Sequence, residues 1–466
     1  MRTVTKALLT TSSARPTRLA GRLCTATEVN TTPPSSFLLS GEIKLLWLLV
    51  FLFIAFSLLP SDFSWAYADT ANAALEGSLA MKLEWGGIFF LAGIILLRHL
   101  SVALNDLIVV NFFLLMMILW CGLSTFWSPI PDVNVKRVVE FVGALGMAIV
   151  IQWSPSPFAF LVKSVLAGLT CLMIASLIVV IVNPAIGIDY ELGNAWRGVI
   201  LQKNEAGQIA ALAVLLWQAR AYIEAVPRIT FIVGLCFSLL MLVMAKSSSS
   251  VLICALTTTI FHLFRRKYIH AAYPILRLFL ITLALIIVGL EIFHTLNGRL
   301  PSWEEISSPV AALFGKGSDL TGRTQIWELV QQEISLHPIT GLGYGAFWLG
   351  PGSLSDPIIQ ALFWIPLQSH NGYLDIINEQ GFIGLSFLLL TFILQGYNLT
   401  KLAHFDRLQA AFLCAVFISI IGSNFTESGL FRGVDFQHIF FIITIVATTS
   451  ALRRYKLLHE PKPTKN

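Results

Sequence analysis

Charge is scarce in this sequence, because charged residues make up only 12% of its 466 residues. Soluble domains carry about a quarter charged residues. Hydrophobic residues reach 56%, and the mean hydropathy is +0.76. This balance excludes a soluble globular enzyme and indicates a protein that crosses a membrane several times. The net charge of +5 reflects segments that are expected on the cytoplasmic side. Since the chain lacks a basic soluble face, we expect no nucleic-acid partner.

Cysteines and metal-binding motifs are also sparse. Five of the six cysteines fall in apolar segments, and Cys24 lies in a polar tail, so none has a candidate disulfide partner. The outside loops contain none of the His-X3-His, Cys-X2-Cys or Asp-X-Asp spacings that are typical of metal sites. No Gly-X-Gly-X-X-Gly or P-loop motif for a nucleotide occurs either. We therefore expect no metal and no other cofactor.

Long apolar runs recur along the whole chain. A run of about 17–25 residues is long enough to cross a bilayer as a helix. We predict twelve spans, at residues 43–60, 85–99, 107–126, 138–153, 160–182, 206–222, 229–245, 250–264, 278–294, 381–399, 408–422 and 434–451. The expected fold is therefore an all-α polytopic membrane helix bundle, with one long outside loop at residues 295–371 between the ninth and tenth spans.

The distribution of lysine and arginine orients this bundle, because positive charge is retained on the cytoplasmic side during insertion. With the N-terminus inside, 21 of the 31 basic residues fall on the inside. The ten assigned to outside loops are Lys82, Lys136, Arg137, Arg197, Lys203, Lys246, Arg299, Lys316, Arg323 and Arg432. An outside cation opposes the orientation signal, and this suggests that some of these residues serve a function.

The two ends of the sequence are polar. Residues 1–42 are rich in serine and threonine and are predicted to be a disordered cytoplasmic tail, or to follow from a misplaced start codon. Residues 453–466 form a second cytoplasmic tail. The first span is followed by Ala66-Tyr67-Ala68, a pattern that a signal peptidase can cut. An uncleaved anchor is the favoured interpretation, because the charged region before the span is long.

Two outside connections contain candidate binding residues. After the third span, Trp127 is typical of an interface anchor, and Arg137 is a candidate for holding a lipid phosphate. Between the fifth and sixth spans, Arg197 and Lys203 place two cations next to Asn204, which we predict to cap the following helix. Together they suggest an anion site, with snorkelling to lipid headgroups as the alternative.

The long loop contains a predicted helix that starts next to an arginine. Thr321 is the predicted N-cap, Ile326, Val330 and Ile334 share one face, and His337-Pro338 ends the helix. Arg323 then lies in the first turn, where its forked donors and the open backbone amides suit a diphosphate. A solvated arginine on an amphipathic helix is the alternative. Gly341, Gly343 and Gly345 are expected to form a flexible turn before Phe347 and Trp348, whose rings suit sugars.

A second helix start carries a histidine. We predict that a helix begins at His370, where the positive end of its dipole favours a neutral imidazole that can act as a general base. Asn371, Asp375 and Glu379 share one face of that helix, so they either line a polar cavity or satisfy one another. In the last outside loop, Glu427 is a candidate partner for one of the arginines.

The order of these motifs resembles a known family. Thr321-Gly322-Arg323-Thr324, then Gly341-Leu342-Gly343-Tyr344-Gly345, then Ser369-His370-Asn371-Gly372-Tyr373, preceded by Trp196-Arg197-Gly198, are similar to the O-antigen ligase and Wzy-type polysaccharide polymerase superfamily. The likeness runs from about the third span to the twelfth, with the ligase-related domain at about residues 200–395. Within the family the pattern is most similar to exopolysaccharide polymerases.

The resemblance implies a metal-independent, inverting glycosyltransferase with a GT-C-like helical fold at the periplasmic face of the bacterial inner membrane. Its donor would be a glycan on undecaprenyl diphosphate, and its acceptor a glycan or a lipid. By similarity, Arg197 and Arg323 bind the diphosphate and His370 deprotonates the acceptor hydroxyl. The implied substrate contacts are Lys203, Asn204, Asn371, Tyr373, Glu427 and Arg137. Membrane lipids, a flippase and a co-polymerase are the implied partners.

Three other functions fit parts of the sequence. An O-antigen ligase shares the same framework and differs only in its acceptor. A twelve-span transporter or flippase of lipid-linked glycan normally has ionisable residues near the bilayer midplane and repeated halves, and neither is evident here. A membrane protein that binds glycan without reacting would retain the arginines but would not need His370.

Overall fold

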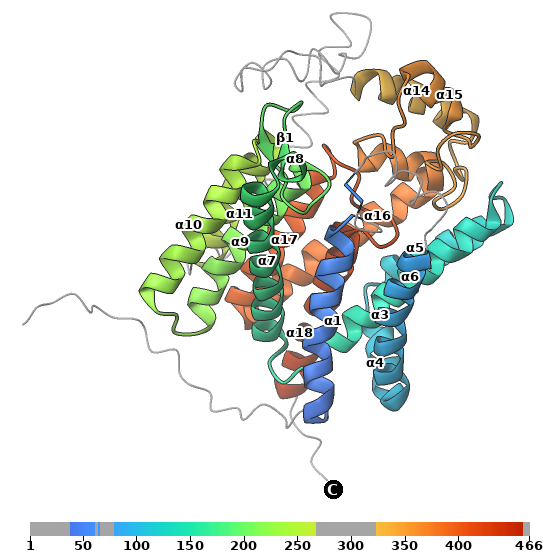
Figure 1. Ribbon diagram of the computed structural model, residues 1–466. Coiled ribbons are helices and arrows are strands. Elements are labelled where there is room, and N and C mark those ends of the chain that lie inside the picture. The colour runs from blue at the N-terminus through green and yellow to red at the C-terminus, as the bar shows by residue number, and fades with distance from the viewer. Residues whose placement is uncertain (1–37, 61–63, 66–78, 267–322, 460–466) are drawn as a thin grey trace, which may run out of the picture. The chain divides into compact units, whose positions relative to one another are not determined.

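The computed structural model describes residues 38–60, 64–65, 79–266 and 323–459, which all belong to one compact unit, residues 36–466. Within these ranges the chain is predominantly helical (Figure 1). Several predicted features lie outside the described residues. These are most of the tail 1–42, the pattern Ala66-Tyr67-Ala68, the span 278–294, the loop segment 295–322 with the Thr321 cap, and the end of the C-terminal tail.

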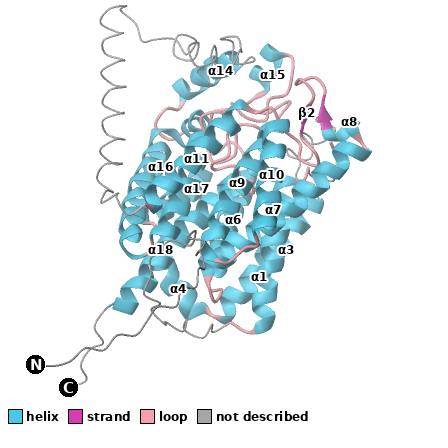
Figure 2. Cartoon of the chain, turned by 90° about the vertical axis from the view of Figure 1, so that its left-hand side faces the viewer, coloured by secondary structure: helices cyan, strands magenta, loops and turns pink. Residues whose placement is uncertain are grey.

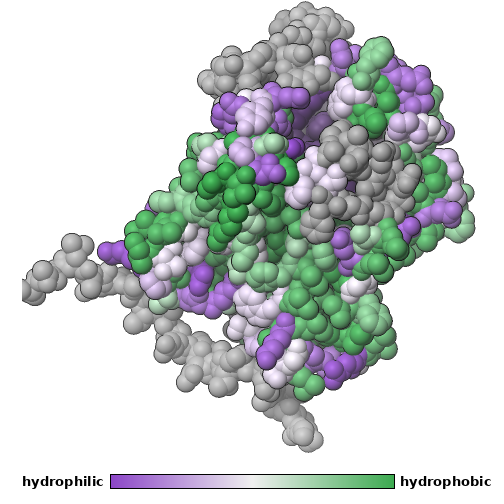
Figure 3. All heavy atoms as spheres, in the orientation of Figure 1, coloured by the Kyte–Doolittle hydropathy of each residue, from purple (hydrophilic) through white to green (hydrophobic). Residues whose placement is uncertain are grey.

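The described apolar segments form long helices because their side chains are hydrophobic around most of the helix surface. Their bounds are α1 Ser40–Leu58, α3 Leu79–Arg98, α4 Leu100–Val109, α5 Phe112–Leu123, α6 Pro131–Ile151, α7 Pro157–Val182, α9 Lys203–Ile223, α10 Arg228–Met244, α11 Ser248–Arg265, α16 Gly372–Phe405, α17 Arg407–Ser423 and α18 Phe436–His459. Hydrophobic side chains cover much of the face seen in Figure 3, with hydrophilic ones toward its two ends.

Six of the described helices are long and apolar enough to cross a membrane, and the number rises to seven if one bent pair is a single span. The bent pair is α4 and α5, which meet at an angle of 101°. This bend corrects the prediction of one continuous span at 107–126. Asn111 causes the break locally, because its side-chain oxygen caps α5 and its amide donates to the carbonyl of Thr391 on α16. The total of twelve spans stays a prediction.

A second break divides α16. Gly381 has φ 66° and ψ −173° inside this helix, so residues 372–380 form a separate segment ahead of the apolar part. A side chain at residue 381 would collide with the backbone of Ile339, which explains why glycine is needed there. The predicted tenth span begins at residue 381, where the helix is kinked, although the apolar helix as a whole runs from Gly372 to Phe405.

Polar contacts at the two ends of the bundle follow the predicted alternation. At the end predicted to be inside, Arg98 pairs with Glu42 at 3.1 Å and Arg453 pairs with Asp106. At the opposite end, side chains from α9, α14 and the α17–α18 connection meet. Each of these contacts joins residues that were predicted to lie on the same side of the membrane. The relative sidedness therefore agrees with the prediction.

Short elements gather at the end predicted to be outside (Figure 2). They are η2 Ser124–Phe126, α8 Pro184–Gly187, α14 Arg323–Leu336, α15 Asp356–Leu362 and a two-stranded antiparallel sheet of β1 Ile188–Asp189 and β2 Ala195–Trp196. In this sheet Ile188 is opposite Trp196. An apolar cluster that includes Ile326, Val330 and Phe347 holds α14 on the loop that follows it. This cluster positions the start of α14 and the chain around residue 370.

Candidate functional site

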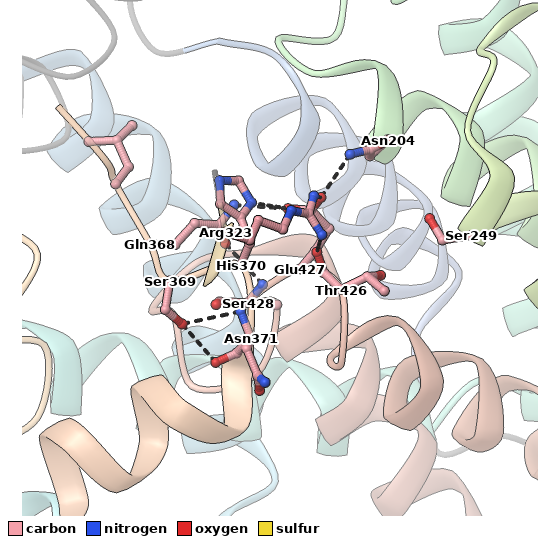
Figure 4. Close-up of polar contacts among 12 residues, drawn as sticks. Asn204, Ser249, Arg323, Gln368, Ser369, His370, Asn371, Thr426, Glu427 and Ser428 are labelled. Carbon is pink, nitrogen blue, oxygen red and sulfur yellow. Dashed lines mark hydrogen bonds and ion pairs between the residues drawn. The ribbon is translucent and has the colours of Figure 1, made fainter. Parts of the chain in front are cut away.

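The carboxylate of Glu427, in the connection between α17 and α18, is the centre of a cluster of polar side chains (Figure 4). Its Oε1 atom accepts hydrogen bonds from Arg323 Nη2 at 2.9 Å and Asn204 Nδ2 at 2.8 Å. Its Oε2 atom lies 2.8 Å from His370 Nδ1 and accepts from Gln368 Nε2 at 3.1 Å. Four side chains from three distant parts of the sequence therefore meet on one buried carboxylate.

Arg323 is the first residue of α14, so its predicted position in the first turn of this helix is confirmed. From there its side chain reaches Glu427. Besides its bond to Glu427, its Nη1 atom donates to the carbonyl of Thr426 at 2.6 Å. The helix is held in place by the buried Ile326 and Val330, and the indole of Trp327 donates to the carbonyl of Ser369 at 2.8 Å. The guanidinium thus bridges α14 and the α17–α18 connection, and α14 also fixes the chain just before His370.

His370 is held in an unusual backbone conformation. Its φ of 57° is in the left-handed region, which costs a residue other than glycine about 1–3 kcal/mol and is typical of functional sites. On one side, the buried backbone amide of Ser369 donates to Asp375 at 3.3 Å. On the other, the side chain of Asn371 accepts from the amides of Tyr373 and Leu374 and caps α16. The backbone therefore directs the imidazole toward Glu427.

The predicted helix start at His370 is wrong by two residues, because α16 begins at Gly372. The amide of Gly372 donates to the carbonyl of Asn424 at 2.9 Å, and a side chain at residue 372 would collide with the Asn424 carboxamide. This close approach joins the start of α16 to the loop that carries Glu427. The imidazole lies before the cap, where its nearest described charge is the carboxylate of Glu427 rather than the end of a helix dipole.

Electrostatics keep Glu427 ionised. Burial by itself raises the pKa of this carboxyl, but the hydrogen bond from His370 and the charges of His370 and Arg323 outweigh burial, so the pKa lies below its ordinary value. A carboxylate only accepts hydrogen bonds, so His370 Nδ1 carries a proton in this contact. The neutral tautomer then has its lone pair on Nε2, where it can take a proton from a substrate.

The predicted cations Arg197 and Lys203 donate hydrogen bonds to backbone carbonyls near the start of α9. Arg197 Nε donates to the carbonyl of Ile186 at 2.8 Å, and its Nη1 donates to the carbonyl of Leu201 at 3.4 Å. Lys203 Nζ donates to the carbonyl of Leu192 at 3.4 Å.

Asn204 behaves differently from the prediction. The N-cap of α9 is Gln202, and Asn204 is the second residue of the helix, so its predicted capping role is wrong. Its side chain instead donates to Glu427, which joins α9 to the cluster. The prediction of Asn204 as a functional contact is unaffected, because a side chain in the first turn of a helix still faces whatever lies before that helix.

Three further predicted contacts have structural partners. Asn371 caps α16 through its side-chain oxygen. The hydroxyl of Tyr373 donates to the carbonyl of Ile421 at 2.9 Å. Arg137 forms an ion pair with Glu140 at 3.2 Å and lines a cavity together with Asp375 and Glu379. Of the three residues predicted to share one face, Asp375 and Glu379 line this polar cavity, which was one of the two alternatives, and Asn371 does not. The substrate roles of Asn371, Tyr373 and Arg137 stay predictions.

The glycine-rich loop is packed rather than flexible, and this corrects the prediction. The amides of Leu342 and Gly343 donate to the carbonyls of Asn378 and Glu379. The amide of Gly345 donates to the side chain of Glu379 at 2.8 Å. The ring of Phe347 is fully buried and is therefore not accessible to a sugar, whereas Trp348 lines the cavity.

Gln368 was not predicted from the sequence. Its amide nitrogen donates to Glu427 and its oxygen accepts from the amide of Ser428 at 2.9 Å. Its position two residues before His370 was the one sequence feature that could have suggested a role in the site. The segment is irregular, however, and has no periodicity from which the direction of a side chain can be predicted. Among the described residues, no group of three or more His, Cys, Asp or Glu side chains is placed to hold a metal ion. Independence of a metal stays a prediction.

Two comparisons with known proteins bear on this site. Residues 231–389 match the family model described as O-antigen ligase, a segment that includes Arg323 and His370. The chain is also 22% identical over 286 residues to the exopolysaccharide production protein ExoQ of Rhizobium meliloti (strain 1021). That alignment covers 58% of this chain and 61% of the relative, which is less than two thirds of its length. Both similarities support the O-antigen ligase and polymerase superfamily and confirm the resemblance predicted from the motifs.

Proposed function

We propose that this multi-pass membrane protein of the O-antigen ligase and polymerase superfamily is a glycosyltransferase that polymerises oligosaccharide repeats carried on undecaprenyl diphosphate. The reaction takes place at the periplasmic face of the bacterial inner membrane, and its product is an exopolysaccharide or an O-antigen. The observation that carries this proposal is the contact between His370 and Glu427, beside Arg323. This contact fixes the tautomer of His370, the proposed base, and places it next to the positive charge of Arg323.

His370 is the proposed general base. Its Nδ1–H donates to Glu427, so Nε2 accepts the proton of an acceptor hydroxyl while that oxygen attacks the anomeric carbon of the donor. The carboxylate of Glu427 orients the ring and stabilises the imidazolium that forms. Positioned general bases accelerate reactions by about 10²–10⁴-fold. An exposed imidazole with no partner would lack both the orientation and the compensating charge.

Arg323 and Arg197 are the proposed diphosphate ligands. The bond between the acceptor oxygen and the anomeric carbon forms as the bond from that carbon to the diphosphate oxygen breaks, which inverts the anomeric centre. Undecaprenyl diphosphate leaves with the bonding electrons. Arginine offsets the charge that develops on the diphosphate and presents forked donors to it. The diphosphate-linked donor supplies the driving force, so the reaction needs no nucleotide, and in this proposal the two arginines take the place of a metal at the diphosphate.

Polymerisation is the favoured reaction because the matching relative is named as an exopolysaccharide production protein. The alternative is a ligase that transfers the lipid-linked glycan to a lipid acceptor such as lipid A-core, and the description of the matching family model favours this reading. The two reactions share the base and the diphosphate ligands and differ in the acceptor. Membrane lipids, a flippase that delivers the donor and a co-polymerase are proposed partners.

A reconstituted reaction separates the two candidates. The purified protein is placed in lipid nanodiscs with one undecaprenyl-diphosphate-linked repeat and no other acceptor, and product length is resolved on a gel. A ladder that His370→Ala abolishes and that His337→Ala retains supports a polymerase. His337 is the matched control, because it is an exposed histidine in the same loop. If no ladder forms but the glycan is transferred when a lipid acceptor is added, the result supports the ligase.

A further inference from the structure

A cavity of about 240 Å³ lies next to the Glu427 cluster but has a separate lining. Its walls come from the end of α1, the start of α3, α6, the glycine-rich loop, the first segment of α16 and the α17–α18 connection. His370, Arg323, Glu427 and Arg197 are not among its lining residues. Its volume is slightly below the usual range of about 300–1,000 Å³ for small-molecule pockets. This size suits one small ring system rather than a lipid tail.

Charged and hydrogen-bonding side chains line the cavity. Four carboxylates, those of Glu84, Asp375, Glu379 and Asp435, share it with two arginines. A carboxylate accepts hydrogen bonds and a guanidinium only donates them. Sugar hydroxyls do both, so a wall that mixes the two groups can satisfy several hydroxyls of one ring.

Aromatic and amide groups complete this lining. The indoles of Trp85 and Trp348 contribute flat apolar surface, and both residues are buried. The side-chain oxygen of Gln380, a residue only 1% exposed, has no hydrogen-bond partner among the residues that the structure describes. A buried acceptor without a partner costs about 1–3 kcal/mol. A hydroxyl of a bound ligand would satisfy it.

The charge balance identifies which part of the substrate fits. Four carboxylates against two arginines leave an excess of negative charge when all are ionised, and such a cavity repels a diphosphate. Burial raises the pKa of Asp435 to about 6 and that of Glu379 to about 7, so the excess of negative charge is present at neutral and higher pH and is lost under mildly acidic conditions. An uncharged ligand with many hydroxyls is compatible with this lining.

The cavity is linked to the reacting residues through the backbone. Arg432 Nη2 donates to the carbonyl of Leu367 at 2.5 Å, and Asp375 accepts from the amide of Ser369. Both residues line the cavity, and they hold the chain immediately before and after Gln368, next to His370. Trp348 Nε1 donates to Asp375 at 2.8 Å and fixes this wall. A ligand in the cavity therefore lies beside the segment that presents the imidazole.

From this lining and its position we infer that the cavity is a saccharide subsite, which binds an uncharged sugar ring of the glycan while the diphosphate of the donor binds elsewhere. The inference rests on the proposed glycosyltransferase function and adds the location of sugar recognition. Both substrates of a polymerase carry such a ring. The subsite therefore holds a sugar of either the donor or the acceptor, and experiment distinguishes the two.

The test fills the cavity without touching the reacting residues. Ser57 lines the cavity near the end of α1, so Ser57→Phe adds a ring to it. Leu48→Phe is the matched control, because Leu48 is on the same helix and is 47% exposed on its surface. Glu379→Gln is a second variant, which keeps the size of the side chain and removes one negative charge. Each variant is folded if, in nanodiscs, it elutes from a size-exclusion column at the same volume as the wild-type protein.

Affinity is measured for two probes, the lipid-linked repeat and undecaprenyl diphosphate without sugar. We expect Ser57→Phe to weaken binding of the lipid-linked repeat at least tenfold and to leave the sugar-free carrier unchanged, with Leu48→Phe equal to wild type for both. An equal loss for both probes places the carrier in the cavity and overturns the inference. Unchanged affinity for both in Ser57→Phe and Glu379→Gln also overturns it.

Kinetics then identify the source of the sugar. With a preformed oligosaccharide acceptor, a rise in the acceptor KM alone assigns the ring to the acceptor, and a rise in the donor KM alone assigns it to the donor. Either result supports the subsite. In a different outcome, the wild-type protein binds the lipid-linked repeat, with an affinity that Ser57→Phe lowers, and forms no product. That result would refute the glycosyltransferase function but would still support the binding subsite. Failure of the function and failure of the subsite are therefore distinguishable.

Discussion

His370 Nδ1 lies 2.8 Å from Glu427 Oε2, although the two residues are 57 positions apart in the sequence. The same carboxylate binds Arg323 through its other oxygen at 2.9 Å. One buried group therefore sets the orientation of the proposed base and the position of the proposed diphosphate ligand. Loss of Glu427 should consequently affect both proton transfer to His370 and binding of the diphosphate by Arg323.

Replacing Glu427 with glutamine tests this double role. We expect Glu427→Gln to lower turnover by about 10²–10⁴-fold, the range that a positioned base supplies, because the amide neither compensates an imidazolium nor fixes its tautomer. Glu427→Asp retains the charge and should keep more activity than Glu427→Gln. The measurement is single-turnover product formation in nanodiscs. Glu328→Gln, an exposed change on α14, is the control, and equal activity of the two glutamine variants contradicts the role.

The forked shape of Arg323 gives a second prediction. A lysine cannot donate to Glu427 and to the carbonyl of Thr426 with two separate nitrogen atoms, as Arg323 does. We expect Arg323→Lys to weaken donor affinity about tenfold, equivalent to about 1.4 kcal/mol, and Arg323→Ala to weaken it further. Arg98→Lys, at the opposite end of the bundle, should match wild type. Wild-type affinity in Arg323→Lys would show that a point charge is sufficient.

The carboxyl of Asp435 predicts a pH-dependent effect on stability. Burial raises its pKa to about 6 in the folded protein, against an ordinary value of 3.8, so the folded state holds this proton more tightly. The resulting stabilisation is complete below about pH 3.8 and is lost as the pH rises through about 6. The side chain of Asp435 caps α18 by accepting hydrogen bonds from the amides of Gln437 and His438, and asparagine can retain these bonds without a charge. Asp435→Asn should therefore raise the Tm at pH 8 and leave it unchanged near pH 4.

The control for this measurement is Asp132→Asn, at an exposed position in the first turn of α6. Its Tm difference from wild type should be the same at both pH values. A Tm gain of Asp435→Asn that is equally large at pH 4 and at pH 8 would contradict the sign of the predicted proton linkage.

Close packing at Gly372 predicts a large effect of one methyl group. A Cβ atom there would collide with the carboxamide of Asn424, whereas a Cβ at Gly396, also in α16, meets no atom within 4 Å. We expect Gly372→Ala to lower the Tm and the turnover together, and Gly396→Ala to leave turnover unchanged. Thermal melts in detergent and the gel assay measure the two effects. A neutral Gly372→Ala would mean that the loop of Glu427 is free to shift away from α16.

The sequence predicted the features that depend on local chemistry. A helix with Arg323 in its first turn and with Ile326 and Val330 on its buried face was predicted from cap chemistry and helical periodicity. The kink at Gly381 was not predicted. Bends and distant contacts were harder. The run 107–126 is apolar almost throughout, so the bend of 101° beside Asn111 has no signal in hydropathy.

The site was predicted in part for a similar reason. Glu427 was expected to meet an arginine, but its bond to His370 depends on the packing of α14, α16 and the α17–α18 connection. The residue type of Asn204 favours a cap position, but its tertiary contact with Glu427 decides its role. Residue type therefore predicted which residues carry chemistry, and tertiary packing determined their partners.

The most direct test of the central claim is a comparison of His370→Gln with wild type for both donor affinity and single-turnover rate, with His337→Gln as the control. Glutamine can still donate a hydrogen bond to Glu427 but cannot act as a base at neutral pH. The account predicts donor affinity within about threefold of wild type, since the arginines are retained, and a rate lowered by about 10²-fold or more. Retained turnover in His370→Gln, with donor affinity intact, would contradict the assignment of His370 as the base.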